Sequence, residues 1–163
     1  MDQLCIFKKG SKTFKKEWQL FIDGAARNNP GKAGAGIYLL RQDEPILKKG
    51  IYLGIKTNNQ AEYIALLLGL VYAKMYLKSN EMLRINSDSQ LLVRQLMGIY
   101  SVKNPELIKL FNYVKEHLEK INYSICHIPR EQNKIADKLA NNAIDYEYSL
   151  PPDIKELWSK YEL

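Results

Sequence analysis

WQLFIDGAARNNPG, residues 18–31, is the stretch around which the rest of this sequence is arranged. Its apolar first half predicts a strand that is buried on both faces and ends at Asp23 and Gly24. Asparagine, proline and glycine fill the second half and predict a turn whose backbone can approach a ligand closely. A carboxylate at the end of a buried strand costs free energy unless it is paired or binds a metal ion. Strand-ending Asp residues before Gly are common, however, so Asp23 alone is more often structural than functional.

The composition is that of one globular domain: 163 residues, of which 46% are apolar and 26% are charged. The net charge of +6 suits a polyanionic partner, although many proteins that bind none are as basic. The two cysteines, Cys5 and Cys126, are too few for a disulfide framework and indicate a reducing, intracellular setting. With no membrane-length apolar stretch and no signal peptide, we expect a cytoplasmic protein and take a monomer as the default.

The hydrophobic patterns predict an α/β fold with a central five-stranded mixed sheet flanked by helices. Three strands joined by short turns form an antiparallel meander, and helical crossovers then add two parallel strands. The expected strands span residues 18–22, 33–40, 46–55, 82–86 and 121–128. The expected helices span residues 59–77, 90–97, 105–119 and 133–143, with one further helical segment at 153–161. Thr57 and Asn58 stand where the cap of the first helix is expected, and Asn133 is expected to cap the helix at 133–143.

We find no internal repeat and assign residues 17–145 to a single domain. Residues 1–16 form a basic N-terminal extension, either a short hairpin or a loose arm. It is equally compatible with a solvated tail and with a role in binding phosphates. Residues 146–163 form a C-terminal tail.

Four carboxylates lie where the predicted fold brings them together. Asp23 and Asp88 follow neighbouring parallel strands, so their charges repel unless a cation lies between them. Glu62 and Asp137 each lie one turn into a helix and can point to the same place. Taken singly, Asp88 could cap a helix, Glu62 could face solvent, and Asp137 could pair with Lys134 or another nearby Lys. Together, four oxygen ligands without His or Cys describe a site for Mg²⁺ or Mn²⁺, and such sites hydrolyse phosphodiesters.

Four motifs, in this order along residues 17–145, resemble the type 1 ribonuclease H family. They are FIDGAARNNPG (21–31), TNNQAEY (57–63), INSDSQ (85–90) and HIPREQNKIADKLAN (127–141). The short loop at residues 129–131 is most similar to the bacterial and archaeal-type branch, which also resembles ribonuclease H domains of retroelements.

This resemblance implies an endoribonuclease that hydrolyses the RNA strand of RNA/DNA hybrids and leaves 5′-phosphate and 3′-hydroxyl ends. Asp23, Glu62, Asp88 and Asp137 match the family's metal ligands, which implies two Mg²⁺ ions with Mn²⁺ as a possible substitute. A non-catalytic nucleic-acid-binding module on the same fold is the alternative, and four mutually repelling acids argue against it. Another nuclease or a DNA-strand transferase on the same sheet is a third alternative, which the asparagine cluster disfavours.

Five positions match residues with which the family contacts the hybrid. Short amides can both donate to and accept from a 2′-hydroxyl, which distinguishes RNA from DNA. Helix capping is the structural alternative for the asparagines, and one residue can do both. The five positions are Gly24, Asn29, Thr57, Asn58 and Asn59.

The chain departs from the family pattern at two points. Many relatives carry a mobile His before the last helix; His127 has a matching spacing, but we place it on the last strand. Arg130 is then the favoured residue to assist catalysis, with Glu131 as the alternative. Some members grip the hybrid with a basic protrusion, for which the loop at residues 98–104 is too short, so affinity would rest on other surfaces.

Overall fold

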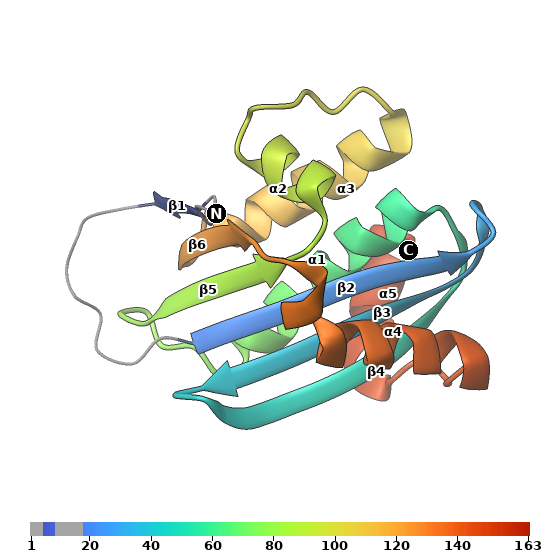
Figure 1. Ribbon diagram of the computed structural model, residues 1–163, viewed down its shortest axis with the longest axis horizontal. Coiled ribbons are helices and arrows are strands. Elements are labelled where there is room, and N and C mark those ends of the chain that lie inside the picture. Colours follow the sequence, from blue (N-terminus) through green and yellow to red (C-terminus); the bar gives the residue numbers. More distant parts are fainter. Residues whose placement is uncertain (1–4, 9–17) are drawn as a thin grey trace.

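A computed structural model of the chain describes residues 5–8 and 18–163, and it confirms the α/β fold with a central mixed sheet (Figure 1). The strands are β1 (Cys5–Lys8), β2 (Trp18–Arg27), β3 (Gly31–Arg41), β4 (Glu44–Lys56), β5 (Met82–Ser87) and β6 (Asn122–His127). The helices are α1 (Asn58–Lys74), α2 (Gln90–Leu96), α3 (Pro105–Leu118), α4 (Lys134–Tyr146) and α5 (Lys155–Tyr161). Short 3₁₀ turns cover Arg130–Gln132 and Pro152–Ile154.

The sheet has the strand order β1-β6-β5-β2-β3-β4. The meander of β2, β3 and β4 is antiparallel, and β5 and β6 are added in parallel beside β2, as predicted. All five predicted strands are present. A sixth strand, β1, pairs antiparallel with β6 at the edge of the sheet and comes from the segment that we assigned to the N-terminal extension.

The predicted end of the strand at residues 18–22, which is β2 in the structure, is wrong. β2 does not stop at Asp23 but continues to Arg27, because β3 pairs with it along its whole length. The parallel pairing of β2 with β5 is shorter, and its last pair is Phe21 with Asn86. Asp23 therefore lies inside one strand pair and just beyond the end of the other.

Helices cover both faces of the sheet, with α4 in front and α1 behind in the view of Figure 1. Glycine allows the close approach of α4, since a Cβ at Gly36 would lie 1.9 Å from the carbonyl oxygen of Ala136. Behind the sheet, α1 packs on β2 and β3, and α3 packs on the outer side of α1, so α1 is buried almost all round. In the C-terminal tail, Ile154 and Tyr161 are buried, and the Tyr161 hydroxyl lies 2.9 Å from Nε2 of His117.

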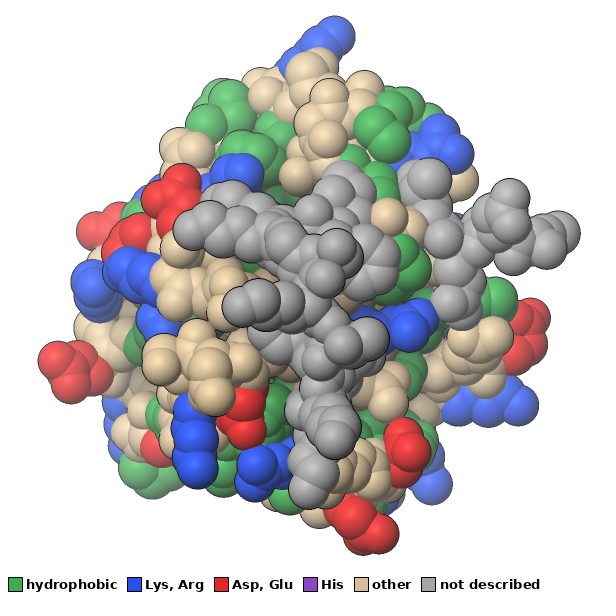
Figure 2. All heavy atoms as spheres, turned by 90° about the vertical axis from the view of Figure 1, so that its left-hand side faces the viewer, with side chains coloured by type: hydrophobic (Ala, Val, Ile, Leu, Met, Phe, Trp, Pro, Cys, Tyr) green, Lys and Arg blue, Asp and Glu red, His purple; other side chains and the backbone are tan. Residues whose placement is uncertain are grey.

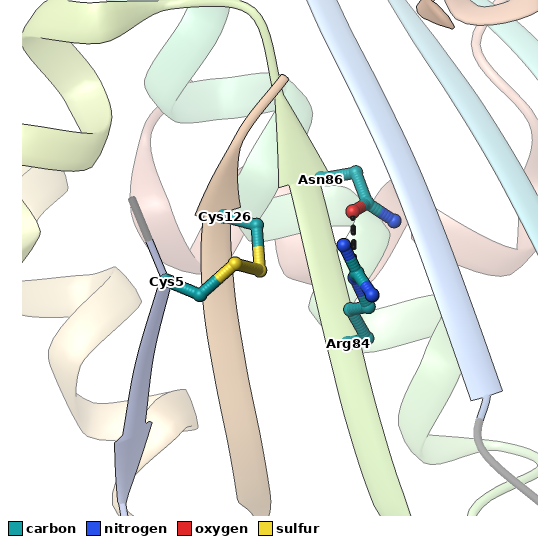
Figure 3. The surroundings of a disulfide bond; sticks show 4 residues. All are labelled: Cys5, Arg84, Asn86 and Cys126. Carbon is teal, nitrogen blue, oxygen red and sulfur yellow. Dashed lines mark hydrogen bonds between the residues drawn. A yellow bond between two sulfur atoms is a disulfide. The ribbon is translucent and has the colours of Figure 1, made fainter. Parts of the chain in front are cut away.

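A disulfide joins Cys5 to Cys126, which face each other in the register of β1 and β6 (Figure 3). Two cysteines were judged too few for a disulfide framework, and this single pair was not predicted because the N-terminal segment had no place in the predicted sheet. A cysteine pair 121 residues apart has no signature in the sequence. The cysteines therefore no longer support a reducing setting.

Charged side chains of both signs are interspersed on the face of the molecule that lies at the left of Figure 1. Figure 2 shows this face, and its coloured side chains form no continuous basic surface among the residues that the structure describes. Within residues 5–8 and 18–163, no helix has the length and apolar character needed to cross a membrane.

Candidate active site

Three of the four predicted acids form a tight cluster. Asp23 on β2, Glu62 on α1 and Asp88 directly after β5 each place a carboxylate oxygen within 4.8 Å of the other two. Asp23 is only 6% exposed, and Glu62 points into the cluster rather than into solvent. Ser89, not Asp88, caps α2 by accepting a hydrogen bond from the backbone N–H of Leu92 at 3.3 Å. Glu62 therefore does not face solvent and Asp88 does not cap a helix, so both structural alternatives are wrong.

Gly24 and Thr57 place Glu62 in this cluster. A Cβ at Gly24 would lie 2.2 Å from the backbone nitrogen of Glu62, so only glycine lets α1 lie this close to β2. The backbone N–H of Gly24 also acts on the Glu62 carboxylate, whose pKa it lowers against larger effects in the other direction. Thr57 begins α1 with a capping box, in which Thr57 and Gln60 each accept a hydrogen bond from the backbone N–H of the other.

The cluster carries more negative charge than the protein compensates. Burial, followed by the charges of Asp88 and Asp137, raises the pKa of Asp23 to about 7, against a smaller lowering by Arg130. Burial, followed by the charges of Asp23 and Asp88, also holds the pKa of Glu62 well above its usual range. Oε2 of Glu62 is buried and has no hydrogen-bond partner among the described residues. An all-carboxylate donor set with these properties fits a hard divalent cation.

Asp137 lines the same cavity but lies outside the tight cluster. Its Oδ1 lies 3.6 Å from Nη2 of Arg130 and 3.3 Å from Nδ2 of Asn141, and neither is the lysine that the structural alternative offered. The cavity has a volume of about 440 Å³ and brings all four predicted acids together. Its lining comprises Asp23, Gly24, Ala25, Ala26, Arg27, Asn58, Asn59, Glu62, Asp88, Ser89, Arg130, Asp137 and Asn141.

The predicted amide residues connect the β2–β3 turn to the start of α1. Oδ1 of Asn29 accepts from the N–H of Asn58 at 3.0 Å, and Oδ1 of Asn58 accepts from the N–H of Ala26 at 2.8 Å. Asn58 and Asn59 line the cavity and are exposed, whereas Asn29 and Thr57 lie beside it. The cap of α1 is Thr57, so capping does not account for the side chains of Asn58 and Asn59.

The loop after β6 differs from the prediction at one residue. His127 lies on β6 as predicted, and its Nε2 is 3.2 Å from the backbone oxygen of Asp88. Arg130 lines the cavity with a side chain that is 80% exposed. Asn133 was predicted to cap α4, but its side chain makes no capping hydrogen bond. It turns inward instead, and Nδ2 donates to the backbone oxygen of Ile22 at 2.9 Å and to Oδ1 of Asp88 at 3.3 Å.

Sequence reasoning missed Asn133, Arg27 and Asn141 as residues of this site. An asparagine before a helix is typical of a cap, and the contacts of Asn133 with β2 and β5 depend on chain segments far apart in sequence. Asn141 lies four residues after Asp137 on α4, and that helical spacing is a signal that could have identified it.

Comparison with known proteins places the fold and the site in a family. The family model described as "Reverse transcriptase-like" matches residues 21–143. Ribonuclease HI of Halobacterium salinarum is 39% identical over 127 residues, which are 77% of this chain and 63% of that protein. Ribonuclease H of Coxiella burnetii is 33% identical over 142 residues, covering 77% of this chain and 88% of that protein.

A solved structure described as LC11-RNase H1 in complex with an RNA/DNA hybrid superposes with a TM-score of 0.77 at 36% identity. The superposition covers 82% of this chain and all of that one (100%). The chain spans less than two thirds of several curated relatives, namely 63% of the Halobacterium protein and 34% of a bifunctional protein of Mycobacterium tuberculosis.

Proposed function

This chain belongs to the type 1 ribonuclease H family, and from that premise we propose that it is an endoribonuclease acting on the RNA strand of RNA/DNA hybrids. The observation that carries the proposal is the cluster of Asp23, Glu62 and Asp88 in an open cavity that also holds Asp137. A pure binding module gains nothing from buried carboxylates that repel one another. The relative solved with an RNA/DNA hybrid supports the same class of substrate.

The ribonuclease H family is metal-dependent, and we propose two Mg²⁺ ions held by Asp23, Glu62, Asp88 and Asp137, with Mn²⁺ as a substitute. The partnerless Oε2 of Glu62 and the raised pKa of Asp23 support a cation in this place, because each reflects negative charge without compensation. When bound, such ions supply a nucleophilic water at neutral pH and stabilise the charge that develops on the leaving oxygen. The expected products carry 5′-phosphate and 3′-hydroxyl ends.

Arg130 is proposed to assist the reaction. Its guanidinium is exposed, lies at the cavity and is 3.6 Å from the Asp137 carboxylate, so it can contact a phosphate of the substrate from the same position. Nε2 of His127 lies beside the backbone oxygen of Asp88, which supports a structural role for that ring. Glu131 stays an alternative to Arg130.

The substrate-binding residues are proposed to be Gly24, Asn29, Thr57, Asn58 and Asn59. Gly24, Asn58 and Asn59 line the cavity, and the two asparagines expose amide groups that can read a 2′-hydroxyl. Asn29 and Thr57 support the start of α1 and extend the same surface beyond the cavity.

We assign the activity to residues 17–145. The C-terminal tail contributes no residue to the cavity lining and packs behind α1 and α3 instead. The basic segment at residues 9–16 lies outside the described residues, and its proposed contact with phosphates stays a prediction. The monomeric state and the cytoplasmic location also stay predictions.

The test is cleavage of end-labelled RNA/DNA hybrid, double-stranded RNA and duplex DNA in the presence of Mg²⁺ or Mn²⁺, with the Asp23→Asn variant beside the wild type. We expect cleavage of the hybrid alone and its loss in the variant. Binding of the hybrid without cleavage under either ion would instead support the non-catalytic module. Cleavage that survives in the variant would show that the site lies elsewhere.

A further inference from the structure

Asn133 is a buried residue whose hydrogen bonds reach three of the four segments that carry the acids. It is 1% exposed. Nδ2 donates to the backbone oxygen of Ile22, the residue before Asp23, at 2.9 Å, and to Oδ1 of Asp88 at 3.3 Å. Its backbone oxygen accepts from the N–H of Asp137 at 3.0 Å. One residue therefore connects β2, the end of β5 and the first turn of α4.

Asparagine is the residue that suits these neighbours. The backbone oxygen of Ile22 and the carboxylate of Asp88 are both acceptors, so the position needs a short side chain that donates twice. An aspartate here would place a third acceptor against these two. The backbone N–H of Asn133 also donates to the oxygen of Arg130 at 3.0 Å, which holds the turn that carries the Arg130 side chain.

The oxygen of the same side-chain amide makes no such hydrogen bond within the part of the chain that the structure describes. Oδ1 of Asn133 is buried and has no hydrogen-bond partner among the described residues. A buried acceptor without a partner costs stability, so a residue chosen for the fold alone would not be expected here. The two donated hydrogen bonds are what this side chain contributes, and one of them ends on a carboxylate of the cluster.

We propose that Asn133 is a positioning residue that sets the distance between Asp88 and β2 and so prepares the carboxylates for a divalent cation. It acts through Asp88 and through the backbone of β2 and α4, and it supplies no ligand of its own. This inference rests on the metal site of the proposed function. Residues that orient metal ligands by hydrogen bonding affect metal affinity by about 10- to 100-fold when they are replaced.

The experiment is a titration with Mn²⁺ alone, without nucleic acid, by isothermal titration calorimetry of the full chain. The Asn133→Ala variant removes both donated hydrogen bonds, and we expect its Mn²⁺ affinity to fall by about tenfold or more. Asn104→Ala is the matched control: Asn104 also begins a helix, but its side chain caps α3 by accepting from Glu106 and Leu107, away from the cavity. We expect the control to lose stability and to keep the Mn²⁺ affinity of the wild type.

Hydrolysis of the hybrid supplies a second readout. In Asn133→Ala we expect a higher half-saturating Mg²⁺ concentration, with the KM for the hybrid unchanged once Mg²⁺ is saturating. A general loss of structure would not produce that separation. Asn133→Ser keeps one hydroxyl donor, so it should show a smaller loss of affinity, and it replaces the alanine variant if the latter does not fold.

Two outcomes would overturn the inference. Wild-type Mn²⁺ affinity in a folded Asn133→Ala protein would mean that Asn133 serves only the fold, while the metal site itself would stand. No Mn²⁺ binding by the wild type would remove the metal site, and with it both the proposed function and the role of Asn133.

Discussion

Replacing Asp23 with asparagine should stabilise the metal-free protein at pH 8, although it removes a proposed metal ligand. In the folded chain the pKa of Asp23 is raised from 3.8 to about 7, chiefly by burial and by the charge of Asp88. The folded state holds the Asp23 proton more tightly than the unfolded state does. Asp23 therefore leaves the free energy of unfolding unchanged well below pH 3.8 and lowers it increasingly as the pH rises to 7. At about 1.4 kcal/mol per pKa unit, the full cost is about 4 kcal/mol.

The assay is urea or thermal unfolding in EDTA at pH 5 and pH 8, for the wild type and for Asp23→Asn. By the same arithmetic, the free energy of unfolding of the variant exceeds that of the wild type by about 1.5 kcal/mol at pH 5 and by about 4 kcal/mol at pH 8. In a chain of this length, 1 kcal/mol corresponds to about 2–4 °C in unfolding temperature. The Asp23 charge also raises the pKa of Glu62, so its removal lowers the free-energy cost of ionised Glu62 and increases the stability of the variant further.

Asp43→Asn is the matched control, because Asp43 is exposed in the β3–β4 turn and has a positive φ that asparagine also tolerates. We expect its stability to stay within about 0.5 kcal/mol of the wild type at both pH values. The reasoning would be refuted if Asp23→Asn were less stable than the wild type in EDTA, or if its gain did not depend on pH. Either result would mean that Asp23 is already compensated by the protein, which would remove the electrostatic argument for a cation.

Three further predictions follow from other contacts. Gly24→Ala should cost about 1–3 kcal/mol in urea unfolding and abolish cleavage, since its Cβ would meet the backbone of Glu62; an active, stable variant would contradict this. Arg130→Ala should lower kcat/KM for the hybrid by about 10- to 100-fold through the loss of a charged hydrogen bond, with an unchanged unfolding curve, because the side chain is exposed. Reduction of the Cys5–Cys126 disulfide should lower the free energy of unfolding by about 2–4 kcal/mol, whereas equal unfolding curves with and without reductant would show that the bond does not form in solution.

The sequence predicted those features that depend on local patterns. Strand alternation and helical periodicity yielded the five main strands and the four main helices, and the position of each acid on its element followed from them. Asp23 and Asp88 could be paired in advance because strands added in parallel place their carboxyl ends side by side. Thr57 and Asn58 were both candidate caps by position, and the structure has Thr57 as the cap, with its partner Gln60 three residues away.

The features that escaped prediction depend on segments far apart in the chain. Nothing near Asp23 shows that pairing with β3 extends β2 to Arg27. Nothing near Cys5 shows that it lies opposite Cys126. Asn133 was misjudged because local preference favours a cap, whereas contact with β2 and β5 offers its amide two acceptors.

The unequal pairing of β2 explains why the site and Asn133 occur together. β2 separates from β5 after the pair of Phe21 and Asn86, yet it stays paired with β3 as far as Arg27. The carbonyl of Ile22 therefore lies beyond the last parallel pair, and the amide of Asn133 supplies the donor that β5 no longer provides. The same separation lets the Asp23 and Asp88 carboxylates face each other across the open end of the parallel pair. One break in the sheet leaves the carbonyl of Ile22 without a partner in β5 and brings the carboxylates of Asp23 and Asp88 together. A residue that donates to that carbonyl is therefore also placed to orient the carboxylates.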